Sequence, residues 1–316
     1  MSTYGNNSII EDIRHEFKYG NVVSKLILIN IAVFLAIRLL HLVFYLGANV
    51  SLEVFENDYV TWLMFPSSFK DFLWQPWTLI SYMFLHTGFM HILMNMIVLY
   101  IFGKLLLGFL GDRQVLPIYV LGGIAGAALY MIIFNISPAF QDISGSHMLG
   151  ASAGVMAVML AMCTMQPNYQ IMLFFIGAVQ VKYIAAVFIL IDLLKIFQDN
   201  PGGHIAHLGG ALFGFIYIKQ LQKGNDLGNG FNRLIDFLVT VFKPGTKKPK
   251  VVYRNEKKQA QTRAANNGKV HKPNKSSMEP KIQVQIDAIL DKISESGYNS
   301  LTKEEKDFLF KTKDHN

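Results

Sequence analysis

The sequence predicts an all-α polytopic membrane protein, in which a bundle of six transmembrane helices is followed by a cytoplasmic tail. Of its 316 residues, 52% are hydrophobic and only 16% are charged, a balance that is rare in soluble domains. The long apolar runs nearly all precede residue 223. The net charge of +7 belongs to residues 224–316, because residues 1–223 hold 11 basic and 11 acidic side chains. Two regions with different surroundings are therefore expected.

Six stretches satisfy the length of a membrane span, since a helix crossing the hydrocarbon core needs about 20 mainly apolar residues. The fourth is short and the sixth is rich in glycine, which suits close packing between helices. Lys and Arg gather at the span ends that this order assigns to the cytoplasm, so both termini are expected there. The six stretches are approximately 25–46, 91–110, 115–136, 150–165, 179–197 and 204–221.

The first turns of spans two, four and six contain the unusual polar residues, and in this topology they lie at similar depth below the outer face. Span two begins HILMN, which places His91 and Asn95 on one helix face. Span four begins GASAG around Ser152, and span six begins HIAHLGG with His204 and His207. Ionisable groups in membrane helices are costly and normally face a protein interior or a water-filled cavity. The pattern predicts one polar pocket.

A hydrolytic reaction suits this set of side chains. Serine becomes a nucleophile when a neighbouring base accepts its proton, and histidine is the usual base near neutral pH. Free amides at the start of span four, with Asn95 and His91, could donate to a tetrahedral oxyanion. Taken singly, Ser152 could serve only close helix contact and His207 could be a packed histidine. Their joint placement favours catalysis.

No acidic side chain is convincingly placed to orient the base. Asp199 precedes span six by a few residues, and Asp192 lies within span five near Lys195. The sequence therefore favours a Ser-His dyad over a triad, with Asp192 serving a structural need such as pairing with Lys195. No metal or other cofactor is expected, because no HExxH motif occurs and no carboxylate accompanies the histidines in the spans.

These motifs resemble those of the rhomboid family of intramembrane serine proteases. The similarity covers about residues 70–223, through WQPWTLISYMFLHTGFMHILMN, LGASAGVMA and HIAHLGGALFG in that order. The resemblance implies that Ser152 is the nucleophile and His207 the base. Where the family commonly has glycine after the nucleophile, this chain has Ala153, and Met156 occupies a position that is often aromatic. These departures bear on rate and substrate preference more than on the reaction class.

The resemblance also assigns supporting roles around the nucleophile. It implies that His91 and Asn95, with the backbone amide of Ala151, form the oxyanion hole. Gly210 and Gly214 match a close contact between the fourth and sixth helices of the family. The residues expected to pack helices near the site are Gly150, Met156, Gly210 and Gly214.

The implied activity is endopeptidase cleavage of the transmembrane helices of other membrane proteins near their outer ends. The expected partners are single-span membrane protein substrates and the lipid bilayer, and the expected location is the bacterial inner (plasma) membrane. One alternative is a catalytically silent relative that binds or escorts membrane proteins. Another is a metal-dependent membrane enzyme or transporter that uses His86, His91, His204 and His207, for which the ligand set is poor.

The tail has two parts. The first is basic and poor in apolar residues, so it is expected to be disordered and to contact anionic lipid, with a plain solvated linker as the alternative. Nucleic-acid binding is not expected, because aromatic platforms are missing. In the second part Thr302 and Glu305 fit a helix capping box. The expected segments are a cytoplasmic N-terminal segment (1–24), a transmembrane protease domain (25–223), a basic cytoplasmic linker (224–280) and a small helical hairpin (281–316).

Overall fold

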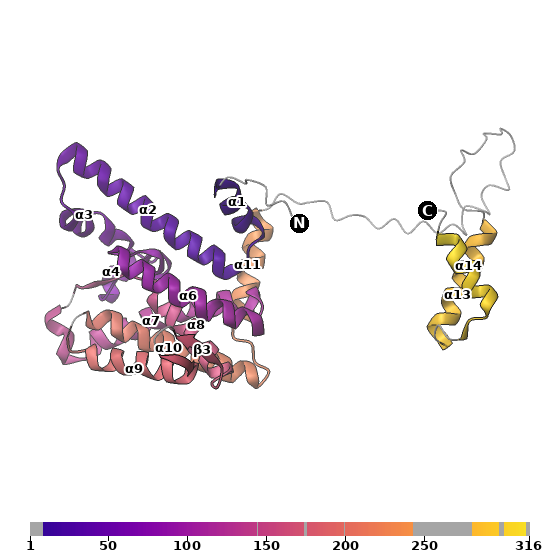
Figure 1. Ribbon diagram of the computed structural model, residues 1–316. Coiled ribbons are helices and arrows are strands. Elements are labelled where there is room, and N and C mark those ends of the chain that lie inside the picture. Colours follow the sequence, from indigo (N-terminus) through magenta and orange to yellow (C-terminus); the bar gives the residue numbers. More distant parts are fainter. Residues whose placement is uncertain are drawn as a thin grey trace, which may run out of the picture. The chain divides into compact units, whose positions relative to one another are not determined.

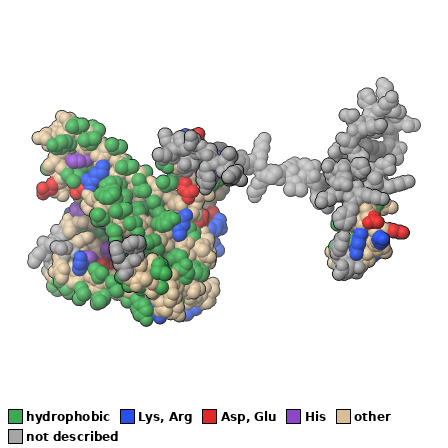
Figure 2. Space-filling view, in the orientation of Figure 1, with side chains coloured by type: hydrophobic (Ala, Val, Ile, Leu, Met, Phe, Trp, Pro, Cys, Tyr) green, Lys and Arg blue, Asp and Glu red, His purple; other side chains and the backbone are tan. Residues whose placement is uncertain are grey.

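The computed structural model describes residues 9–143, 145–173, 176–198, 200–242, 280–296 and 300–313. The chain divides into two compact units, Met1–Thr246 and Lys247–Asn316. The first unit is built of helices with two very short antiparallel sheets (Figure 1). Figure 2 shows hydrophobic side chains over much of the visible face of its helices, as expected for a surface that contacts lipid.

Each of the six apolar stretches contains a helix. Among the described residues, α2, α6 and α7 are long and apolar enough to cross a membrane. With 14 and 15 residues, α8 and α9 rise only about 21–23 Å, while the histidines, glycines and polar last turn of α10 lower its hydropathy. A helical membrane protein is thus confirmed, and six complete crossings stay a prediction. The bounds are α2 (Val22–Ala48), α6 (Phe89–Phe109), α7 (Asp112–Ile136), α8 (Ser152–Met165), α9 (Val181–Lys195) and α10 (Pro201–Gln222).

Helix α8 lies at the centre of the bundle, and every residue from Ala153 to Cys163 is buried. Its closest neighbour is α10, where a Cβ added to Gly210 would overlap the carbonyl oxygen of Ala153. One turn later, a Cβ on Gly214 would overlap the carbonyl oxygen of Ala157. The two backbones therefore touch, which sets the separation between the helix that begins at Ser152 and the helix that carries His207.

A long segment between α2 and α6 folds into short elements. Strand β1 within it pairs with β2, with Phe65 opposite Met148, and so fixes the segment that leads into α8. Strands β3 and β4 form a hairpin between α8 and α9. The bounds are α3 (Leu52–Asp58), η1 (Val60–Leu63), β1 (Phe65–Pro66), α4 (Phe69–Trp74), α5 (Thr78–Ser81), η2 (Tyr82–Phe84), η3 (Pro138–Ile143), β2 (His147–Met148), β3 (Gln170–Leu173) and β4 (Gly177–Gln180).

Two amphipathic helices flank the bundle in sequence, α1 (Ile9–Tyr19) and α11 (Asn229–Phe242). The linker expected from residue 224 onward is therefore wrong for residues 229–242, which form α11. Asp236 of α11 pairs with Arg113 of α7 at 3.1 Å, and Asn232 Nδ2 of α11 donates to the Arg113 carbonyl oxygen at 2.8 Å, so α11 makes polar contacts with the bundle. Residues 243–279 of the expected linker lie outside the described residues, and their contact with anionic lipid stays a prediction.

The second unit contains α13 (Pro280–Ser296) and α14 (Lys303–Lys313). At the start of α14 the Thr302 amide donates to Glu305 Oε2 at 2.8 Å, and the Glu305 amide donates to Thr302 Oγ1 at 3.3 Å. These are the two reciprocal bonds of a capping box. Lys292 of α13 also donates to Glu305 Oε1 at 2.9 Å, which ties the two helices together.

Candidate active site

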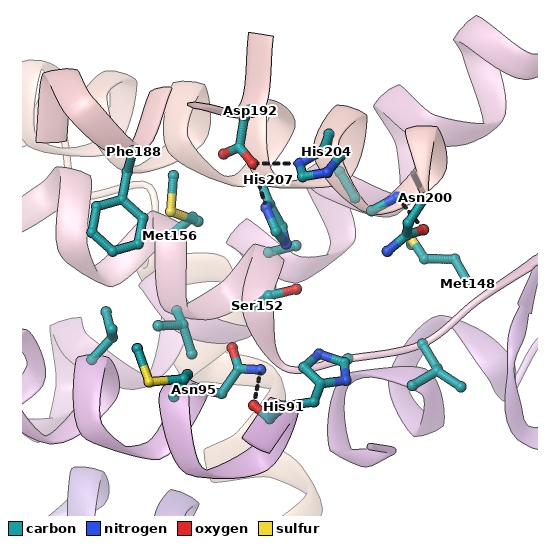
Figure 3. A pocket seen from close by; sticks show the side chains of 18 of the residues that line it. His91, Asn95, Met148, Ser152, Met156, Phe188, Asp192, Asn200, His204 and His207 are labelled. Carbon is teal, nitrogen blue, oxygen red and sulfur yellow. Dashed lines mark hydrogen bonds and ion pairs between the residues drawn. The ribbon is translucent and has the colours of Figure 1, made fainter. Parts of the chain in front are cut away.

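A cavity of about 490 Å³ opens among α6, α8, α9 and α10 (Figure 3). Its wall includes Ser152 from α8, His207 from α10, and His91 and Asn95 from α6. The structure therefore brings together the four polar residues that the sequence proposes for catalysis. Asp192 of α9, which the sequence assigned to a structural role, lines the same cavity.

Ser152 is the first residue of α8 and follows a glycine with unusual backbone geometry. Gly150 has φ +132°, a conformation that favours glycine, and its amide donates to the Tyr82 carbonyl at 2.9 Å. A Cβ at Gly150 would lie 3.2 Å from His91 Nε2 and 3.3 Å from Ser152 Oγ. The imidazole and the hydroxyl therefore border one small space. Ala151, the buried residue before Ser152, is the N-terminal cap of α8. The backbone amides of the first turn of α8 have no carbonyl partner within the helix.

The two α6 residues are partly engaged within their own segment. Asn95 Nδ2 donates to the His91 carbonyl oxygen at 2.9 Å, which leaves one of its two amide hydrogens for another acceptor. Thr87 Oγ1 lies 3.4 Å from His91 Nδ1. When the Thr87 hydroxyl donates to Nδ1, the ring hydrogen is on Nε2, which then acts as a donor toward the space beside Ser152.

Asp192 bridges two histidines. Its Oδ1 lies 2.8 Å from His204 Nδ1 and 2.9 Å from His207 Nδ1. This placement corrects the expectation that no acidic side chain lies beside His207. It also corrects the proposed pairing with Lys195, since Asp192 makes no ion pair with that lysine in the part of the chain that the structure describes. Asp199, the other acid considered, lies outside the described residues.

Two comparisons place these residues in a known family. A family model described as the Rhomboid domain matches residues 73–223. The chain belongs to the rhomboid family. A second model, described only as a family of unknown function, matches residues 279–311, which include all of α13 and most of α14.

Several curated proteins are similar to this rhomboid. RHOMBOID-like protein 12, mitochondrial, of Arabidopsis thaliana is 33% identical over 157 residues, which cover 46% of this chain and 47% of that protein. Presenilin-associated rhomboid-like protein A, mitochondrial, of Danio rerio is 32% identical over 145 residues, covering 43% and 35%. The chain thus spans less than half the length of these relatives. Their mitochondrial names speak against the expected bacterial inner membrane, whereas integral membrane character stands.

Apolar side chains line the rest of the cavity. Met156 of α8 is buried and lies with Phe188 of α9 in the wall beside Asn95 (Figure 3). Gly210 and Gly214 are not part of the wall and act through the α8–α10 contact. A flexible thioether and an aromatic ring suit an apolar substrate segment.

The histidines considered as metal ligands do not form one group. Among the described residues, ligand atoms of Asp192, His204 and His207 lie within 4.8 Å of one another, so these three could hold a divalent ion. The expectation that no carboxylate accompanies these histidines is therefore wrong, because Asp192 supplies one. His86 lies outside the cavity wall and packs edge-on against the His91 ring, with centroids 5.0 Å apart.

Sequence reasoning missed the contacts of Asp192 with the two histidines, although a signal was present. An ionisable side chain within an apolar span is a functional candidate by default, and Asp192 is such a residue. Its partners are 12 and 15 residues away, beyond the turn between α9 and α10. Helical periodicity gives the face of each helix, but it does not give the angle at which two helices meet.

Proposed function

We propose that this rhomboid is an intramembrane serine endopeptidase in which Ser152 is the nucleophile and His207 the general base. The observation that carries the proposal is the common cavity. Ser152, at the start of α8, lines this cavity together with His207. The Nδ1 of His207 is hydrogen-bonded to the Asp192 carboxylate, so Nε2 is the nitrogen that is left to accept the serine proton.

The reaction follows from this arrangement. His207 Nε2 accepts the proton of Ser152 Oγ as the oxygen attacks the carbonyl carbon of the scissile bond. Amides of the first turn of α8, at the positive end of the helix dipole, donate to the oxyanion with His91 and Asn95. His207 then gives its proton to the departing amine. Water attacks the acyl-enzyme in the same manner and restores Ser152.

The proposed substrates are single-span membrane proteins cut near the outer ends of their helices. A peptide bond inside a helix is shielded, so the substrate must unwind locally, and helix-weakening residues should favour cutting. The cavity wall is largely apolar, with Met94, Val98, Met156 and Phe188. Such a wall suits hydrophobic side chains on both sides of the scissile bond.

Cleavage of a single-span reporter by the purified full chain in detergent tests this proposal. Ser152→Ala and His207→Ala should each remove nearly all cutting and leave only a small residual rate, while the thermal unfolding midpoint stays near that of the wild type. A serine-directed fluorophosphonate should label the wild type and leave Ser152→Ala unlabelled. Undiminished cleavage by Ser152→Ala rejects the assignment. A folded wild type that neither cuts nor reacts supports the silent, escorting relative instead.

A further inference from the structure

We infer that Asp192 is a positioning residue for the base, so that the hydrolytic group is a Ser152–His207–Asp192 triad in which His204 anchors the carboxylate. The inference rests on the proposed function and adds to it a residue that the Ser-His dyad leaves out. It starts from the two hydrogen bonds to Asp192 Oδ1, at 2.8 Å from His204 and 2.9 Å from His207.

The hydrogen bond to Asp192 selects the tautomer of His207. A carboxylate only accepts hydrogen bonds, so each Nδ1 at these distances carries a hydrogen. The hydrogen of neutral His207 is then on Nδ1, and the lone pair is on Nε2. Figure 3 shows the His207 ring between Asp192 and Ser152. Asp192 therefore selects the ring form that can accept the serine proton.

The contact between His207 and Asp192 strengthens as His207 gains positive charge during the reaction. When His207 takes the proton of Ser152, the ring becomes a cation that still donates from Nδ1 to Asp192. A hydrogen bond between two ionised groups is stronger than a neutral one, so this contact gains strength as the tetrahedral intermediate forms. The proton stays on Nδ1, and Asp192 remains ionised throughout.

Asp192 is buried, and its side chain is only 6% exposed. Its Oδ2 has no hydrogen-bond partner among the described residues, and the other charged or titratable groups in the cavity wall are Tyr82, His91 and Lys195. A half-satisfied buried carboxylate is unfavourable for folding. If Asp192 served only as a structural hydrogen-bond acceptor, an asparagine amide could take its place at a lower cost of burial. A carboxylate is the better partner for an imidazole that becomes a cation, because its negative charge stabilises that cation.

His204 explains how the carboxylate is held. Its ring approaches Oδ1 from one turn earlier on α10, edge-on to the His207 ring with centroids 5.8 Å apart. Two donors on one oxygen fix the rotamer of Asp192 more firmly than one donor does. Among the described residues His204 makes no hydrogen bond to His207 or Ser152 and acts on the base only through Asp192, so its loss should reduce the rate less than the loss of Asp192.

Asp192→Asn tests the inference in the full-length protein, with the reporter assay described above. An amide can donate to His207 Nδ1 and select the unproductive tautomer, so kcat should fall about 10²- to 10⁴-fold while KM changes less than about threefold. The matched control is Asp226→Asn. Asp226 is a carboxylate that accepts from Tyr217 Oη at 2.7 Å and from the Gly228 amide at 2.8 Å, and it does not line the cavity.

Two further measurements separate positioning from structure. Nitrogen NMR of histidine-labelled protein should show the hydrogen of His207 on Nδ1 in the wild type and a loss of that signature in Asp192→Asn. In a His207→Ala background, Asp192→Asn should cause no further loss of the residual rate. Asp226→Asn should alter kcat per folded molecule by less than about twofold.

The inference is overturned if Asp192→Asn turns over within threefold of the wild type. It is also overturned if the lost activity equals the lost folded fraction while the His207 signature persists. Failure of the proposed function looks different, because Ser152→Ala would then cut as well as the wild type, or the wild type would not cut at all.

Discussion

Gly210 of α10 packs directly on the backbone of Ala153, the residue after Ser152 in α8. A Cβ at Gly210 would overlap the carbonyl oxygen of Ala153, and a carbonyl cannot rotate away as a side chain can. The approach of the two helices is therefore set by the missing side chain. Because His207 lies one turn before Gly210, this contact also sets the distance between His207 and Ser152, the proposed base and nucleophile.

Gly210→Ala should push α10 away from α8. Overpacking of this kind costs about 1–3 kcal/mol, and small displacements of catalytic groups can lower rates about 100-fold. We expect a lower unfolding midpoint and a kcat at least 10-fold below the wild type. Gly108→Ala on α6 is the control, because nothing lies within 4 Å of its added Cβ. Equal kcat values in the two variants would contradict this account.

Gly150→Ala should disturb the site itself. The residue has φ +132°, and the new Cβ would lie 3.2 Å from His91 Nε2 and 3.3 Å from Ser152 Oγ. Backbone strain of this kind costs about 1–3 kcal/mol, and the methyl group would occupy the space proposed for the oxyanion. We expect a lower kcat together with slower fluorophosphonate labelling.

Gly145→Ala separates the two effects of the Gly150 change. Gly145 also has a positive φ, at +92°, but nothing lies within 4 Å of its added Cβ. Both variants should lose stability by comparable amounts, and only Gly150→Ala should lose labelling rate per folded molecule. If Gly145→Ala slows labelling equally, strain in the loop explains the result and the crowding at Ser152 does not.

The lengths of the apolar stretches predicted the positions of the helices well. A helix that contacts lipid and a helix that is buried in the bundle both need an apolar composition, so both give the same signal in the sequence. Their ends depended on local chemistry. Helix α2 begins at Val22, a few residues before the expected start, because Asn21 caps it by accepting the Ser24 amide at 3.1 Å. The α11 helix was missed because a short amphipathic stretch inside a basic tail resembles a linker by composition.

The candidate site was only partly predictable for a related reason. His91, Asn95, Ser152 and His207 were found because they stand at the starts of helices that run in the same direction. Asp192 belongs to the neighbouring α9, and its meeting with His207 depends on the rotation of that helix about its axis. Sequence periodicity is compatible with several rotations, and packing against α8 and α10 chooses among them.

Zinc should inhibit cleavage reversibly. Ligand atoms of Asp192, His204 and His207 lie within 4.8 Å of one another, and a carboxylate with two imidazoles is a good ligand set for Zn²⁺. An ion there would bind His207, the proposed base, and so prevent it from accepting the serine proton. We expect inhibition by micromolar zinc that is relieved by a chelator, while the chelator alone leaves the rate unchanged.

His204→Ala tests the position of the zinc. The variant keeps Asp192 and His207 but lacks one of the three ligands, so its inhibition constant for zinc should rise at least 10-fold. The measurement is the inhibition curve of each protein, normalised to its own rate without zinc. An unchanged inhibition constant would place the ion elsewhere, for example on the substrate.

His86 should make the protein sensitive to acid. The side chain is only 5% exposed, and its burial, with a smaller effect of the nearby His91 ring, lowers the pKa of His86 to about 4. The unfolded chain binds this proton near pH 6.5, so folding loses stability as the pH falls from 6.5 to 4. The loss from this group is at most about 3 kcal/mol.

The unfolding midpoint measured between pH 7 and pH 4 checks this expectation. His86→Phe, which cannot be protonated and keeps an aromatic ring against His91, should flatten the decline relative to the wild type. His15→Gln, at an exposed position on α1, is the control and should follow the wild-type curve. If His86→Phe declines as steeply as the wild type, the acid sensitivity comes from other groups, and the burial of His86 does not control it.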